Sequence, residues 1–135
     1  MTLEFIRPDW SAPKNIHAAT TTRIGGTSLA PFDSLNLADH VGDDLNAVLQ
    51  NRTLLQQSLN LPSEPNWLTQ THSTRVLHLP FDQNRDADAS FTTEKNVICS
   101  VLTADCLPIL LCDNAGTEIA AVHAGWRGLA DGIIG

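Results

Sequence analysis

Three short apolar segments between residues 97 and 122 constrain the fold of this chain most strongly. Residues 97–102 and 107–112 are apolar nearly throughout, and residues 117–122 form a third segment after the turn at residues 114–116. Each is about six residues long, which suits a buried strand and is far shorter than the roughly 20 residues of a membrane-spanning helix. The first two segments are therefore predicted to be strands buried on both faces, and the third is predicted to be a further strand.

Residues 44–59 carry the pattern of an amphipathic helix. Its apolar face is predicted to hold Leu45, Val48, Leu49, Leu55 and Leu59, at spacings of three, four and their multiples. The preceding Asp43–Asp44 pair can cap the helix, and the Asn and Gln residues between the leucines are expected to point outward. Arg52 falls near the apolar face, so we expect it to have a partner.

Further strands are predicted at 16–22, 67–71 and 75–79, where β-branched or alternating apolar residues gather. Residues 29–42 and 82–96 are polar and predict loops. Together these segments predict an α/β (α+β) fold with a mixed, largely buried sheet flanked by helices. Because the residues after 128 predict a helix start shortly before Gly135, we expect an incomplete single domain whose Ile133 and Ile134 have few partners.

Composition argues against several classes of partner. The 135 residues include 8 Lys and Arg against 15 Asp and Glu, and the basic residues are scattered. A nucleic-acid surface needs a basic patch, and the longest apolar stretch is too short for a membrane span, so neither partner is expected. The chain shows no secretion signal and has an odd number of cysteines, namely 3, which predicts a cytoplasmic protein with free thiols.

Three residues at predicted strand ends could bind a metal: His72, Cys106 and His123. Zinc takes His nitrogen and Cys sulfur, and three protein ligands leave its fourth position open, as in catalytic sites. The spacings of 34 and 17 residues match no short zinc-finger pattern. From spacing alone, a small buried apolar residue is the favoured interpretation of Cys106, ahead of a metal ligand. The glycines beside Arg23 and Arg127 resemble anion-binding turns, or serve simply as tight connections.

The whole chain resembles the bacterial laccase-domain family, also called multicopper polyphenol oxidase-like or purine nucleoside phosphorylase-like proteins and peptidoglycan editing factors. The matching segments include Gln70-Thr71-His72, Asp86-Ala87-Asp88-Ala89-Ser90, Thr103-Ala104-Asp105-Cys106-Leu107-Pro108 and His123-Ala124-Gly125-Trp126-Arg127-Gly128-Leu129. Ser73 stands where the family more often has glycine. Since the family is roughly twice this length, the resemblance identifies residues 1–135 as the N-terminal part of one laccase-like zinc-binding domain.

The resemblance implies a zinc-dependent enzyme that splits adenosine, inosine and methylthioadenosine with phosphate and also deaminates adenosine. It assigns the metal and the catalysis to His72, Cys106 and His123. Nucleoside and phosphate would be the partners, with Arg23, Asn36, Arg52 and Arg127 as candidate substrate-binding residues, because guanidinium groups suit anions. The oligomeric state is left open.

Three alternatives are open at this point. Cys106 and His123 could form the nucleophile and base of a hydrolase or amidase that edits peptidoglycan precursors. Two His and one Cys also suit copper in a polyphenol oxidase, although Met1 is the only methionine available as an axial ligand. A metal with four protein ligands would instead be structural, in a partner-binding module.

Overall fold

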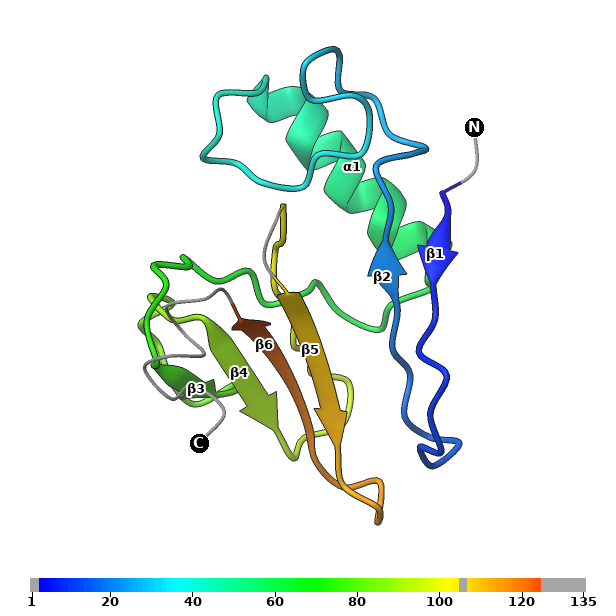
Figure 1. The fold of residues 1–135 in the computed structure, drawn as a ribbon, viewed down its shortest axis with the longest axis vertical. Coiled ribbons are helices and arrows are strands. Elements are labelled where there is room, and N and C mark those ends of the chain that lie inside the picture. The colour runs from blue at the N-terminus through cyan, green and yellow to red at the C-terminus, as the bar shows by residue number, and fades with distance from the viewer. Residues whose placement is uncertain (1–2, 105–106, 125–135) are drawn as a thin grey trace. The chain divides into compact units, whose positions relative to one another are not determined.

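The computed structural model describes residues 3–104 and 107–124 of the chain. One helix and six strands lie within these ranges (Figure 1). In chain order they are β1 (Phe5–Ile6), β2 (Thr20–Thr21), α1 (Leu45–Ser58), β3 (Val76–His78), β4 (Ala89–Thr92), β5 (Leu107–Cys112) and β6 (Ile119–Ala124). No helix among them has the length and apolar character needed to cross a membrane.

The main sheet has the strand order β3-β4-β6-β5 (Figure 1). Strands β3 and β4 pair in parallel, whereas β4 pairs with β6 and β6 with β5 in antiparallel fashion. The predicted mixed α/β architecture is therefore confirmed. Strand β5 forms an edge of the sheet, and Leu111 on it is 47% exposed, so the prediction that this segment is buried on both faces is wrong for that residue.

The chain divides into two compact units. The first unit comprises residues 1–10 and 18–61 and contains α1 together with the small antiparallel pair β1-β2. The second comprises residues 11–17 and 62–135 and contains the main sheet. Its core includes Leu68, Leu77, Leu79 and Ala87 in one cluster, with Ala89, Val122 and Ala124 in another.

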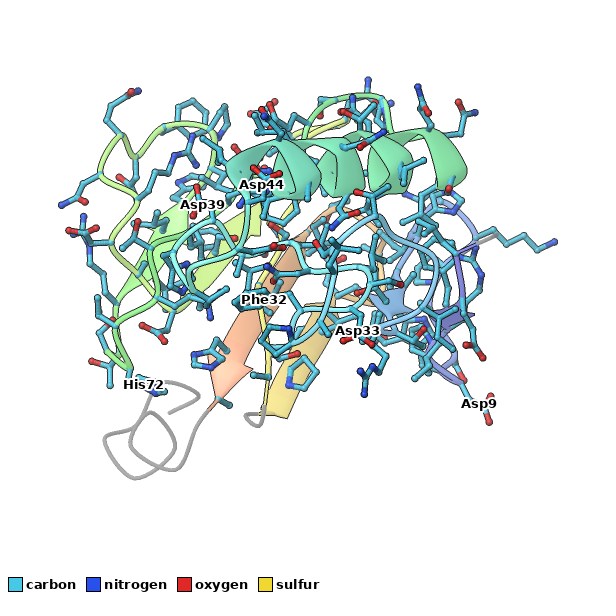
Figure 2. All side chains as sticks on the ribbon, turned by 90° about the horizontal axis from the view of Figure 1, so that it is seen from above. Asp9, Phe32, Asp33, Asp39, Asp44 and His72 are labelled. Atoms are coloured by element: carbon cyan, nitrogen blue, oxygen red, sulfur yellow. The ribbon has the colours of Figure 1, made fainter. Side chains whose placement is uncertain are left out.

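Helix α1 confirms the predicted helix to within one residue at each end. Asp44, which Figure 2 labels, is its N-cap and accepts a hydrogen bond from the Asn46 backbone N–H. The predicted apolar face is only partly correct, because Leu45 and Leu49 are 56% and 51% exposed. The buried face consists of Val48, Leu55 and, between them, Asn51.

Asn51 was expected to point outward, yet it is fully buried and serves as a hub for the loop before the helix. Its Oδ1 accepts from the Thr27 N–H at 2.8 Å, and its Nδ2 donates to Ser28 Oγ at 2.9 Å and to the Asn36 carbonyl at 2.8 Å. A buried amide is tolerated when it is fully hydrogen-bonded, as here. The hub therefore explains why a polar residue replaces a leucine on the inner helix face.

Several predicted strands are shorter than expected or absent. Of 16–22, only Thr20–Thr21 is strand, and the predicted loop at 82–96 contains β4. Segments 67–71 and 97–102 form no strand ladder. One isolated bridge joins Asn66, just before the first segment, to Cys99, and another joins Thr69 to Asp86. Side-chain amides replace the ladder: Gln70 accepts from the Leu102 N–H and donates to its carbonyl, both at 2.7 Å. The segments thus lie side by side without regular strand pairing.

Candidate metal centre

His123 lies inside the main sheet, one residue before the end of β6. Its backbone N–H donates to the carbonyl of Asp88 at 2.7 Å, and its side chain is buried. Asp88 directly precedes β4, whose first residue, Ala89, pairs with Val122. The register of β4 against β6 therefore places Asp88 next to His123.

The Asp88 carboxylate is fully buried and accepts five hydrogen bonds. Its Oδ1 accepts from the backbone N–H groups of Thr71 and Ser73, both at 2.9 Å, and from Ser73 Oγ at 3.1 Å. Its Oδ2 faces the His72 N–H at 3.0 Å and Nδ1 of His123 at 2.6 Å. Burial acts to raise the pKa of Asp88, but these hydrogen bonds, led by the one from His123, outweigh it and leave the pKa below its ordinary value.

His72 lies on the loop that wraps around this carboxylate, and Figure 2 labels it. Its backbone has a φ of 59°, in the left-handed region that few residues other than glycine adopt. The residue is exposed, unlike the other two members of the group. Its ring meets the ring of His123 edge-on, with the ring centroids 5.1 Å apart.

Together, His72, Asp88 and His123 form a group that could hold a metal ion. Each of the three residues offers one potential ligand atom, and these three atoms all lie within 4.8 Å of one another. The donor set suits zinc or copper, since imidazole nitrogen is a preferred ligand of both and a carboxylate binds either directly or through a histidine. The group combines one exposed histidine with a buried histidine–carboxylate pair, so a bound ion would remain accessible to small molecules.

The structure brings two of the three predicted metal ligands together, and the third, Cys106, lies outside the described residues. Sequence reasoning missed Asp88. The segment from Asp86 to Ser90 matches the family, but the match by itself implies no role for Asp88. The sequence signal for it is weak and consists of a charged residue between two alanines.

Three of the four predicted substrate residues lie in the first unit, and Arg127 lies outside the described residues. Arg23 forms an ion pair with Asp33 at 3.2 Å, and its side chain is 73% exposed (Asp33 is labelled in Figure 2). Asn36 donates to Asp43 Oδ2 and to the Ala38 carbonyl. Arg52 donates twice to the Leu37 carbonyl, at 3.0 and 2.8 Å, which confirms the partner expected for it.

Curated relatives match nearly all of this chain. A Haemophilus influenzae protein named purine nucleoside phosphorylase is 58% identical over 133 residues, covering 98% of this chain and 54% of that protein. Purine nucleoside phosphorylase YfiH of Escherichia coli K12 is 51% identical over 134 residues, covering 97% and 55%. The chain thus spans about half the length of the curated relatives it matches.

Solved structures show the same fold. A crystal structure of a Neisseria meningitidis protein superposes with a TM-score of 0.89 at 49% identity and covers 96% of this chain and 54% of that one. YlmD from Geobacillus stearothermophilus gives a TM-score of 0.87 at 31% identity, covering 96% and 52%.

The family can be assigned from a match along most of the chain. The sequence model of the multi-copper polyphenol oxidoreductase laccase family matches residues 17–135. This range contains His72, Asp88 and His123, together with α1 and the whole main sheet. The chain therefore belongs to the multi-copper polyphenol oxidoreductase laccase family.

Proposed function

We propose that this chain supplies the metal centre of a zinc-dependent purine nucleoside phosphorylase. The observation that carries the proposal is the group of His72, Asp88 and His123. It lies in a chain whose curated relatives are named purine nucleoside phosphorylase. That residues 1–135 are the N-terminal part of one zinc-binding domain is part of the same proposal.

His72, His123 and Cys106 are the proposed zinc ligands. Nδ1 of His123 is occupied by Asp88, so its Nε2 is the nitrogen left for a metal. Cys106 directly precedes Leu107, and Leu107 pairs with Ala124, the neighbour of His123. Two imidazoles and one thiolate leave a fourth position of a tetrahedral ion open for water or substrate. When bound there, zinc would supply Lewis-acid polarisation of the substrate or of a water molecule.

The proposed reaction is phosphorolysis of adenosine, inosine or methylthioadenosine. A phosphate oxygen forms a bond to C1′ of the ribose, and the bond from C1′ to the purine nitrogen breaks. The purine leaves with the electron pair and takes up a proton. Deamination of adenosine, in which water replaces the amino group and ammonia leaves, is the second proposed activity.

Of the two proposed arginines that the structure describes, Arg23 has a more accessible side chain than Arg52. Its ion pair with Asp33 is exposed, and such a surface pair exchanges readily for another anion. Arg127 is proposed for phosphate on its sequence alone. Arg52 on α1 and Asn36 in the loop before it are also proposed, since Arg52 binds the Leu37 carbonyl beside Asn36.

The test combines metal analysis with a turnover screen of the full chain. We expect about one zinc per chain, and release of purine and ribose 1-phosphate from at least one of the three nucleosides when phosphate is present. His72→Ala should lose both, whereas His40→Ala, which removes an exposed histidine outside the group, should retain both. A wild-type chain that binds no zinc and releases no purine would overturn the proposal.

Metal analysis and activity assays of the same protein also distinguish the alternative functions. Copper is the metal in the family's description, and a copper-loaded protein with oxidase activity and no phosphorolysis would favour the polyphenol oxidase. A metal-free protein whose Cys106 is readily alkylated would favour the hydrolase or amidase, since zinc binding occupies the thiolate.

A further inference from the structure

We propose that Asp88 is the positioning residue of the candidate metal centre. It holds the His123 ring with the proton on Nδ1, and it holds the 71–73 loop in the conformation that presents His72. The inference rests on the proposed function only in that the two histidines are metal ligands. The contacts that carry it are internal to the second unit.

The first contact fixes the protonation pattern of His123. Among the residues that the structure describes, every hydrogen-bond partner of the Asp88 carboxylate other than the imidazole is an N–H or O–H donor. Asp88 therefore acts as a pure acceptor, and Nδ1 of His123 must donate to Oδ2 across 2.6 Å. Both side chains are almost wholly buried, so water does not compete for this hydrogen bond. The lone pair of His123 is thereby directed to Nε2.

The second set of contacts fixes the backbone around His72. The carboxylate accepts the three consecutive N–H groups of residues 71–73, in the manner of an anion held by a turn. His72 adopts a φ of 59° within this turn, a conformation that a histidine rarely takes without support. The hydrogen bonds from both sides of His72 provide that support.

One carboxylate thus orients two histidines that are separated by 51 positions in the sequence. It also has no capacity left to bind a metal itself. A carboxylate offers about four lone-pair sites, and Asp88 already accepts five hydrogen bonds. Although its oxygen lies close enough to the imidazoles to be a ligand, the geometry assigns it to orientation.

The test compares Asp88→Asn with Asp86→Asn in the full chain. Asp86 is exposed and lies two residues away, so its substitution makes the same chemical change without touching the group. Nitrogen-15 NMR of the imidazoles in the metal-free protein reports which ring nitrogen of His123 carries the proton. Competition with a chelator reports the zinc affinity.

We expect wild type and Asp86→Asn to carry the His123 proton on Nδ1 and to bind zinc equally. Asp88→Asn offers one acceptor oxygen in place of two, and its amide can donate to Nδ1 and so move the ring proton to Nε2. We therefore expect the His123 proton at Nε2 and a zinc affinity lower by about 10–100-fold. A proton on Nε2 in the wild type, or unchanged affinity in Asp88→Asn, would overturn the inference.

The wild-type NMR measurement stands even where Asp88→Asn fails to fold, and Ser73→Ala then serves as a milder variant. It removes one donor to Oδ1 and should weaken zinc binding less than loss of the carboxylate. The NMR result also requires neither zinc nor nucleoside. A wild type with the Nδ1 proton but no phosphorolysis would refute the proposed reaction alone, whereas an active wild type with the Nε2 proton would refute only the role of Asp88.

Discussion

Replacing Asn51 by leucine is expected to destabilise the first unit although the helix face there is otherwise apolar. The substitution keeps the size of the side chain and removes every hydrogen bond of the hub. Two backbone groups then lose the partner that the structure gives them: the Thr27 N–H and the Asn36 carbonyl. The Ser34 carbonyl, also bound by Asn51, keeps its bond from the Ser28 N–H.

Each of these two backbone groups, left without a hydrogen bond and shielded from water, lowers the free energy of unfolding by about 1–3 kcal/mol. Burial of the leucine methyl groups stabilises the fold by about 1–2 kcal/mol. The net free energy of unfolding should therefore fall by about 3 kcal/mol. This is a large fraction of the roughly 5–15 kcal/mol that stabilises a domain.

Urea denaturation followed by circular dichroism measures this change, since α1 is the helix of the described residues. Asn46→Leu on the same helix is the matched control, because Asn46 is exposed and its substitution should change stability by no more than about 0.5 kcal/mol. A loss below about 1 kcal/mol in Asn51→Leu, or a more stable protein, would refute the reasoning.

Three further predictions concern one residue each. Gly26→Ala places a methyl group 2.2 Å from the Ser34 carbonyl oxygen, so the backbone must shift and the free energy of unfolding should fall by about 1–3 kcal/mol; an unchanged melting temperature would contradict this. The hydrogen bond from Ser28 lowers the pKa of Asp43, so Asp43 stabilises the fold above the ordinary carboxyl pKa and this contribution is lost as the pH falls through the lowered value. Acid unfolding of Asp43→Asn should therefore depend less on pH than that of wild type, and identical acid transitions would argue against it. Removal of zinc by a chelator should lower the melting temperature of wild type and leave that of His72→Ala unchanged; equal shifts would place the metal elsewhere.

The sequence predicts helix α1 and strands β5 and β6 well because their signals are local. Helix α1 has a cap and a period, and segment 107–112 has a continuous apolar run bounded by polar residues. Strand β4 is missed because only Phe91 among its four residues is large and apolar. Its pairing partners, β3 and β6, determine that it is a strand, and pairing is not visible in a local window.

The residues of the candidate site also differ in how clearly the sequence indicates them. His72 and His123 stand out as residue types that bind metals, and the structure places their rings together. Asp88 has no such mark, since an aspartate in a polar stretch is ordinarily solvated. Its role follows from the register of β4 against β6, which brings residues 35 positions apart into contact. Asn51 is missed for a related reason: its partners belong to a loop whose path no periodicity predicts.

The division of the chain has a consequence for its synthesis on the ribosome. Residues 11–17 belong to the second unit although residues on both sides of them belong to the first. Asn15 in this short segment donates to the carbonyl of Gly116, which is made 101 residues later. At a synthesis rate of roughly 5–20 residues per second, about 5–20 s pass between the synthesis of Asn15 and that of Gly116. A ribosome-bound chain that ends before Gly116 therefore cannot form this hydrogen bond, even if the first unit has already folded.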